Sequence, residues 1–140
     1  MKDITALFEI FPICQKIILN TIDMKSLDLT KTQLFILFAL SGRQSLNMSQ
    51  IATYIASSKE QATRAVAPLV TEGYVSRYHN EENRKRVFIR LTKKGESLIQ
   101  TEKELVKLRL EDQFNQLSSE DRLAFQKSLS ETLSILKKLE

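Results

Sequence analysis

The sequence predicts a mainly helical fold that contains one small β-hairpin. Only three glycines and two prolines occur among 140 residues, so long helices meet few residues that would end them. Apolar residues recur at helical spacing along most of the chain, whereas residues 74–91 contain two segments in which apolar and polar residues alternate, as in strands. No internal repeat interrupts this order, and we expect a single domain over residues 1–140.

The first helix is expected over residues 3–22, and its apolar face is unusually wide. A helix that is apolar around most of its circumference is buried, often against another chain. Pro12 removes one backbone donor, which predicts a kink or a late helix start. Cys14 lies on the apolar face and is expected to be a small buried residue.

Three further helices each begin with the sequence pattern of a capping box. In this pattern Ser, Thr or Asn is followed three residues later by Gln, and each side chain accepts a hydrogen bond from the other residue's backbone N–H. The pairs are Thr30 with Gln33, Asn47 with Gln50, and Ser58 with Gln61. The expected segments are a helix to Ser41, a loop over 42–46, a short helix to Ile55, a turn at Ala56–Ser57, and a helix to Glu72 capped by Gly73.

A hairpin and two long helices complete the chain. The strands are expected over 74–78 and 86–91, joined by a polar loop over 79–85, and the helices over 93–116 and from Ser118 onward. The central order of helix, turn, helix and hairpin is that of a winged helix-turn-helix. We expect this lobe over residues 30–95. The helices within 1–29 and 96–140 carry more apolar surface than one small core needs, which favours a dimer interface over packing on their own chain.

The counts of reactive residues exclude several classes of site. One cysteine and one histidine rule out a disulfide within the chain and argue against a metal centre, and three scattered glycines cannot form a phosphate-binding loop. No nucleophile and base stand in a catalytic pattern, so we expect no enzyme and no cofactor. No apolar run reaches the roughly 20 residues that span a bilayer, and no signal peptide is visible, so we expect a cytoplasmic protein with no membrane partner.

The basic charge is concentrated in the middle of the chain. The net charge is +4, and residues 47–92 hold seven basic and four acidic side chains, whereas residues 93–140 hold nine of each. Neutralising phosphates requires basic groups gathered on one surface. The distribution therefore favours double-stranded DNA as the partner.

Two runs of sequence carry a family resemblance. The first is IATYIASSKEQATRAVAPLVTEGYVSR, from Ile51 to Arg77, and the second is NRKRVFIRLTKKG, from Asn83 to Gly95. Together they resemble the winged-helix core and wing of the MarR family of bacterial transcription regulators. The resemblance implies a dimer with interlocking terminal helices, a recognition helix in the major groove and a wing in the minor groove.

The resemblance identifies the helix after Ser58 as the recognition helix. Gln pairs with adenine, Arg or Lys with guanine, and Thr with a thymine methyl group or a phosphate. Gln61 has a competing role in the capping box, and Arg64 could instead pair with Glu60 at the i, i+4 spacing. The candidate DNA-binding residues are Lys59, Glu60, Gln61, Thr63 and Arg64 on this helix, and Arg84, Lys85 and Arg86 in the wing.

The chain departs from the family pattern at two places. Pro68 replaces a residue that is usually charged and should kink the recognition helix after its opening turns. Residues 83–85 read Asn-Arg-Lys where the family usually has Asp, any residue and Arg. Asn83 cannot form the ion pair that steadies a tip arginine.

Members of the family commonly bind a small aromatic or anionic effector between the dimer helices and the DNA-binding lobe. Four aromatic side chains could line such a pocket, although aromatic residues at helical spacing also form cores. They are Phe8, Phe11, Phe35 and Phe38.

These observations predict a homodimeric, sequence-specific DNA-binding transcriptional regulator. We expect a repressor that binds a pseudo-palindromic operator and that a small effector releases. The alternative is a winged-helix module that binds another protein and does not read DNA.

Overall fold

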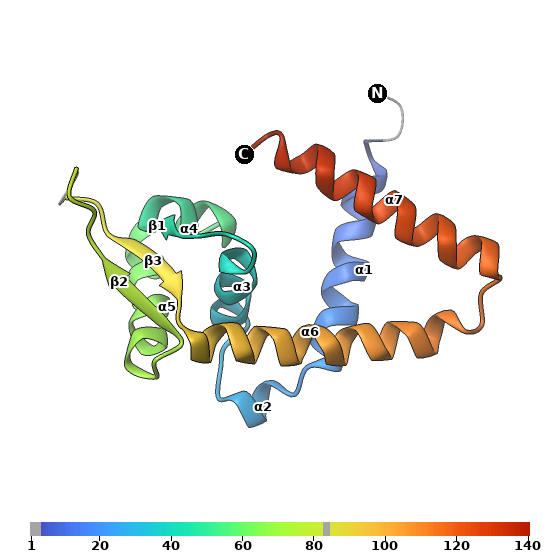
Figure 1. Ribbon diagram of the computed structural model, residues 1–140, viewed down its shortest axis with the longest axis horizontal. Helices are drawn as coiled ribbons and strands as arrows, with labels where there is room; N and C mark the ends of the chain where they lie inside the picture. The colour runs from blue at the N-terminus through green and yellow to red at the C-terminus, as the bar shows by residue number, and fades with distance from the viewer. Residues whose placement is uncertain (1–3, 83–84) are drawn as a thin grey trace. The chain divides into compact units, whose positions relative to one another are not determined.

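The computed structural model describes residues 4–82 and 85–140, and it confirms the mainly helical winged helix-turn-helix fold (Figure 1). The helices are α1 (Ala6–Thr21), α2 (Met24–Leu27), α3 (Lys31–Leu40), α4 (Met48–Tyr54), α5 (Lys59–Thr71), α6 (Lys93–Phe114) and α7 (Ser119–Lys137). The strands are β1 (Leu46–Asn47), β2 (Val75–Tyr78) and β3 (Phe88–Leu91).

The chain divides into two compact units, of which one ends at Leu105 and the other begins at Val106. The first unit contains α1 to α5, the sheet and the first part of α6. The expected winged-helix lobe, residues 30–95, therefore lies entirely within the first unit. In the second unit, Phe114 packs edge-on against Phe125 with ring centroids 4.7 Å apart.

Hydrogen bonds confirm all three predicted capping boxes. At the start of α3 the Thr30 hydroxyl accepts from the Gln33 backbone N–H at 3.1 Å, and the Gln33 side-chain Oε1 accepts from the Thr30 backbone N–H at 2.9 Å. The same reciprocal pair is present at α4 and at α5. These bonds satisfy backbone donors that a helix start leaves without partners, so they fix where each helix begins.

The predicted glycine cap at the end of α5 is also confirmed. Gly73 has a positive φ of 79°, and its N–H donates to the carbonyl of Val70 at 3.0 Å. The Tyr74 N–H donates to the carbonyl of Leu69 at 2.9 Å, which completes a Schellman motif. The motif ends α5 and turns the chain directly into β2.

The three strands form an antiparallel sheet in the order β1-β3-β2. The alternating pattern predicts β2 and β3 but not β1, and the predicted loop over 42–46 is wrong at Leu46. A strand of two residues shows no periodicity, so only its pairing with β3 reveals β1. Helix α2 is likewise not predicted from the sequence, because its four residues are too few to display a helical pattern.

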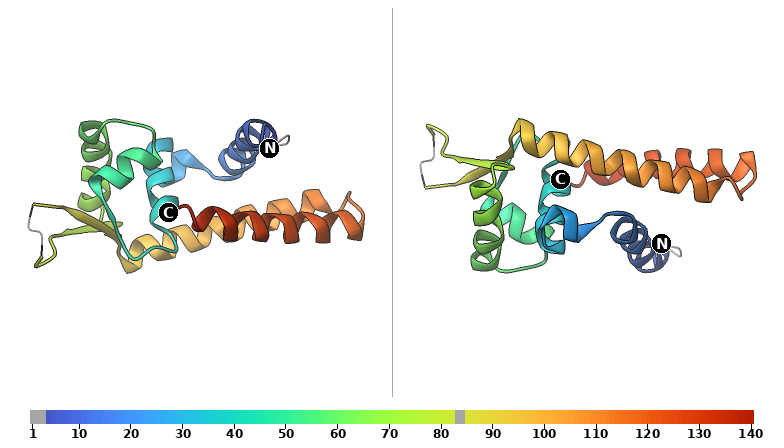
Figure 2. Two further views of the ribbon diagram at one scale, coloured as in Figure 1. Left: turned by 90° about the horizontal axis from the view of Figure 1, so that it is seen from above. Right: turned by 90° about the horizontal axis from the view of Figure 1, so that it is seen from below.

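The core of the first unit joins α5 to the other helices and to the sheet. Fully buried aliphatic side chains from these elements meet there, and each contributes about 1.5–3 kcal/mol of stability. Figure 2 shows the ribbon from two further sides, and α5 lies beside β2 in the structure. The core residues include Leu34 and Leu37 of α3, Ile51 of α4, Val66 and Leu69 of α5, Val75 of β2 and Ile89 of β3.

The two prolines lie inside helices that continue past them. Helix α1 begins six residues before Pro12, so Pro12 does not delay the helix start. Pro68 lies near the end of α5, where its carbonyl accepts from the Glu72 N–H at 2.9 Å. The expectation that Cys14 is buried is wrong, because α1 buries none of its residues.

Candidate nucleic-acid interface

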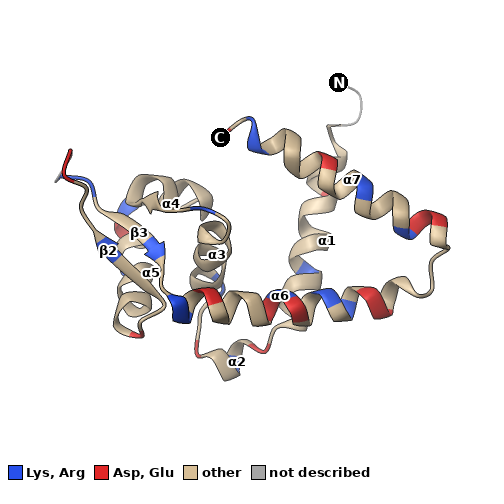
Figure 3. Ribbon diagram, in the orientation of Figure 1, with Lys and Arg blue, Asp and Glu red and all other residues tan. Residues whose placement is uncertain are grey.

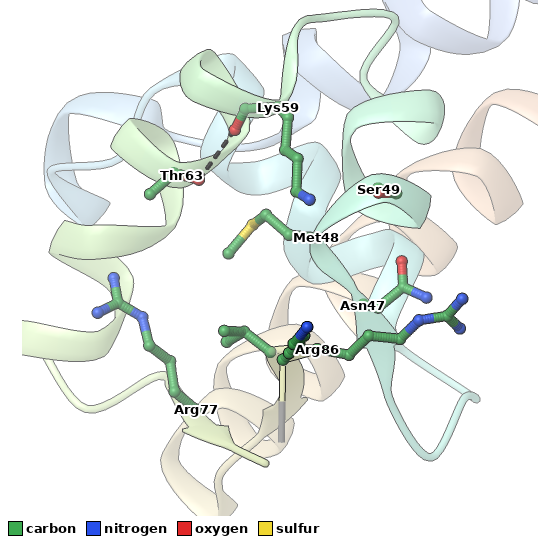
Figure 4. A pocket seen from close by; sticks show the side chains of 9 residues that line it. Asn47, Met48, Ser49, Lys59, Thr63, Arg77 and Arg86 are labelled. Carbon is green, nitrogen blue, oxygen red and sulfur yellow. Dashed lines mark hydrogen bonds between the residues drawn. The ribbon is translucent and has the colours of Figure 1, made fainter. Parts of the chain in front are cut away.

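A hollow of about 510 Å³ lies where α4, α5 and the wing meet (Figure 4). Among the described residues that line it, four side chains are basic and none is acidic. The lining therefore attracts an anionic group. The lining residues are Asn47, Met48, Ser49, Lys59, Thr63, Arg77, Lys85, Arg86 and Val87.

Arg77 reaches the hollow because of strand alternation in β2. Val75 is buried and Arg77 follows two residues later, so both side chains stand on the same face of the sheet. Arg77 also lies opposite the buried Ile89 in the antiparallel register. Arg77 is absent from the residues predicted for the site, although its spacing from Val75 indicates the direction of its side chain.

The other face of the wing carries Arg90, which contacts side chains of β2 and does not line the hollow. The Arg90 Nε donates to the Ser76 hydroxyl at 3.4 Å, and the guanidinium lies 4.6 Å from the ring centroid of Tyr78. Tyr78 in turn stacks on Phe88 at 5.7 Å between centroids. Arg90 is therefore held against the outer face, away from the residues that line the hollow.

Lys59 and Thr63 belong to the first turns of α5 and face the hollow together. They are four residues apart, which places them on one face of the helix. The Thr63 hydroxyl donates to the Lys59 carbonyl at 2.9 Å (Figure 4). The buried Met48 lies between Lys59 and Arg77 in this view.

Gln61 is engaged in the capping box of α5. Its Oε1 accepts from the Ser58 N–H at 3.3 Å and from the Ser57 hydroxyl, while its backbone N–H donates to the Ser58 hydroxyl at 3.1 Å. The competing structural role is therefore confirmed, and Gln61 does not line the hollow.

Arg64 is exposed and does not line the hollow either. In the part of the chain that the structure describes, no ion pair joins it to Glu60. Of the predicted recognition residues, Lys59 and Thr63 thus line the hollow, whereas Gln61 and Arg64 do not.

The wing supplies two of the predicted basic residues to the hollow. Lys85 and Arg86 line it, whereas the predicted Arg84 falls outside the described residues. Lys and Arg mark both β2 and β3, while α6 carries charges of both signs (Figure 3). The basic excess predicted from the sequence is therefore located on the wing and the start of α5.

Comparison with known families identifies the winged lobe. The model of the MarR family matches residues 29–87, which span α3 to the wing. The winged lobe of this chain is similar to the MarR family. A relative is YfiV of Bacillus subtilis (strain 168), named as an uncharacterized HTH-type transcriptional regulator and 30% identical over 104 residues. The match covers 74% of this chain and 65% of YfiV, so it spans just under two thirds of that protein's length.

Solved structures share the fold of this chain. The YusO protein from Bacillus subtilis is 24% identical, with a TM-score of 0.66 over 96% of this chain and 94% of that one. RV1404 from Mycobacterium tuberculosis is 20% identical, with a TM-score of 0.75 over 94% and 89%. These likenesses extend beyond the lobe to the flanking helices.

The four aromatic residues predicted for an effector pocket lie on two helices, α1 and α3. Phe8 and Phe11 on α1 are 76% and 66% exposed, and Phe35 and Phe38 on α3 are half-buried. None of the four lines the hollow beside α5. An effector pocket at these residues stays a prediction.

Within residues 4–82 and 85–140, His, Cys, Asp and Glu form no cluster of three or more that could hold a metal ion. No helix in this part of the chain is long and apolar enough to cross a bilayer.

Proposed function

We propose that this chain is a sequence-specific regulator of transcription that binds double-stranded DNA. The observation that carries the proposal is the hollow between α5 and the wing. Lys59, Arg77, Lys85 and Arg86 line it, and no acidic side chain is among its described lining residues. In this proposal α5 enters the major groove, which admits a helix, and the wing follows the backbone into the adjacent minor groove. The hollow then receives the intervening phosphates.

We further propose that the protein acts as a homodimer through its terminal helices. Neither α1 nor α7 buries any residue, and large apolar side chains stand exposed along both. Contiguous exposed apolar surface marks interaction sites, and a two-fold dimer would recognise a pseudo-palindrome with half-sites about one helical turn apart. The exposed residues include Leu7, Phe8 and Phe11 of α1, and Leu123, Leu129, Leu133 and Leu136 of α7.

Repression and its relief complete the proposal. A dimer bound to an operator would block access to the promoter. A small aromatic or anionic molecule held by Phe8, Phe11, Phe35 and Phe38 would release it. Melting curves with salicylate or benzoate test this part, because a molecule that binds the folded protein raises its melting temperature. Equal melting curves with and without these probes would contradict it.

The test of DNA binding is a titration of the protein against the DNA upstream of its own gene. We expect saturable binding whose log affinity falls linearly with log salt, with a slope of about −0.9 for each phosphate contacted. Weak binding that ignores sequence would contradict the proposal. The double variant Arg64→Ala, Lys85→Ala separates it from a protein-binding module, since unaltered DNA affinity would favour the module.

A further inference from the structure

The exposed side chains of α5 occupy different positions around the helix. Ala62, Val66 and Leu69 form its buried stripe. Arg64 lies two positions from both Ala62 and Val66, which is about 200° around the helix at about 100° per residue. Arg64 therefore stands opposite the core, on the part of α5 that would project furthest into a groove.

Gln61 cannot read adenine in its present arrangement. A bidentate contact to adenine needs the side-chain oxygen as acceptor and the amide as donor at the same time. The Gln61 Oε1 already accepts from the Ser58 N–H and from the Ser57 hydroxyl, which occupies both of its lone pairs. The backbone N–H of Ser58 can only donate, so this orientation of the amide is fixed while the cap is intact.

Lys59 belongs to the group of basic side chains that line the hollow. It lines the hollow with Arg77, Lys85 and Arg86, where basic groups from two elements converge. Contacts to phosphates position a protein but carry no direct sequence information. Arg64 is exposed outside this cluster, and no ion pair with Glu60 competes for its guanidinium among the described residues.

We infer that Arg64 is the side chain of α5 that determines sequence preference, and that the base it selects is guanine. This inference rests on the proposed DNA-binding function. The guanidinium presents paired donors that match the O6 and N7 acceptors of guanine in the major groove. Gln61 holds the helix start in place, and Lys59 neutralises phosphate.

The experiment selects preferred sequences from random double-stranded DNA with three proteins, namely the wild type, Arg64→Gln and Lys59→Gln. The two variants remove the same charge from the same helix. We expect the wild type to enrich a motif with a guanine in each half-site. Arg64→Gln should lower the preference for that guanine about 10-fold or more, and should favour adenine there, because Gln pairs with adenine. Lys59→Gln should enrich the same motif as the wild type. It should also reduce the magnitude of the slope of log affinity against log salt concentration by about 1.

A third variant, Gln61→Glu, tests the capping role directly. Glu retains the acceptor that the box requires but loses the amide donor, so the enriched motif should not change. If Arg64→Gln enriches the same motif as the wild type, the inference is overturned but the proposed DNA-binding function is not. The same holds if the motif enriched by Gln61→Glu lacks an adenine that the wild-type motif contains. A wild type that enriches no motif would overturn the proposed function, and the inference with it.

Discussion

Glu102 shows at the residue scale how burial changes chemistry. Its side chain on α6 is only 6% exposed. Burial raises the pKa of its carboxyl above the ordinary 4.5, and the negative charge of Asp23 raises it further. The pKa of Asp23 is itself lowered, chiefly by the Ser26 hydroxyl, which donates to it at 2.6 Å. Ionised Glu102 therefore costs stability in the folded state.

We predict that Glu102→Gln stabilises the protein at pH 7. A raised pKa in the folded state means that the folded chain holds the proton more tightly than the unfolded chain. Stability is therefore lost as the pH rises from about 4.5 through the folded pKa, and Gln avoids that loss. Thermal melting at a series of pH values measures the difference, which should vanish below pH 4.5. Glu104→Gln, at an exposed position of the same helix, is the control. An equal gain in both variants would contradict the prediction.

Gly95 is required by a close approach between α6 and the end of the recognition helix. A Cβ atom at this position would lie 2.1 Å from the Tyr74 carbonyl oxygen. The Gly95 N–H also donates to the Thr92 hydroxyl at 3.1 Å, and the same hydroxyl donates to the Gly73 carbonyl. The residue therefore fixes the joint between α5, the wing and α6.

Gly95→Ala should lower the free energy of unfolding by about 1–3 kcal/mol, since a backbone carbonyl must shift to admit the methyl group. Urea denaturation measures this loss. Ser97→Ala lies two residues further along α6 at an exposed position and should change stability by less than about 0.5 kcal/mol. Wild-type stability in Gly95→Ala would show that the close contact between Gly95 and the Tyr74 carbonyl does not constrain the joint.

At the scale of elements, the two faces of the wing carry arginines with different surroundings. Arg77 shares its face with the buried Val75 and lines the hollow, whereas Arg90 stacks on Tyr78 on the outer face. Their charges are equal, so any difference in their effect on DNA binding reflects where the sheet directs them.

Arg77→Ala should weaken DNA binding for all sequences and reduce the salt slope by about 1, because one phosphate contact is lost. Arg90→Ala should leave both the affinity and the slope close to the wild-type values. Fluorescence anisotropy at several salt concentrations measures both quantities. Equal effects of the two substitutions would contradict the assignment of the hollow as the phosphate site.

At the scale of the whole molecule, the terminal helices lack the burial that usually stabilises an amphipathic helix. Most of a helix's stability in a protein comes from packing of its apolar face. The α7 residues Leu129 and Leu133 are nevertheless 53% and 54% exposed. A second copy of the chain would supply the missing packing surface.

Leu129→Glu combined with Leu133→Glu should convert a dimer, at about twice the 16.1 kDa of the chain, into a monomer. Light scattering after size exclusion measures the mass. DNA affinity should fall by about 100-fold or more, because linked binding sites gain about 10²–10⁴ over separate ones. Ser130→Glu, at an exposed polar position of α7, should remain dimeric. A wild-type protein that is already monomeric would contradict the proposed dimer.

The sequence carries much of the fold because several signals are local. Each capping box needs only residues within one turn, so Thr30, Asn47 and Ser58 mark helix starts without reference to the rest of the chain. The two-residue β1 has no local signal, because its strand geometry comes from pairing with β3. The candidate site could also be predicted only in part. Lys59 and Lys85 follow from their positions in a sequence motif, whereas placing Arg77 requires knowing which face of the sheet its side chain occupies.

The sequence by itself determined the order of the helices, the wing and the basic character of the central segment. Those features depend on periodicity, capping and charge, which are properties of neighbouring residues. Only the tertiary structure decided which side chains converge. Strand register placed Arg77 beside the same hollow as Lys59. The physical reason is that the meeting of side chains from α5 and the sheet arises from packing between elements distant in the chain.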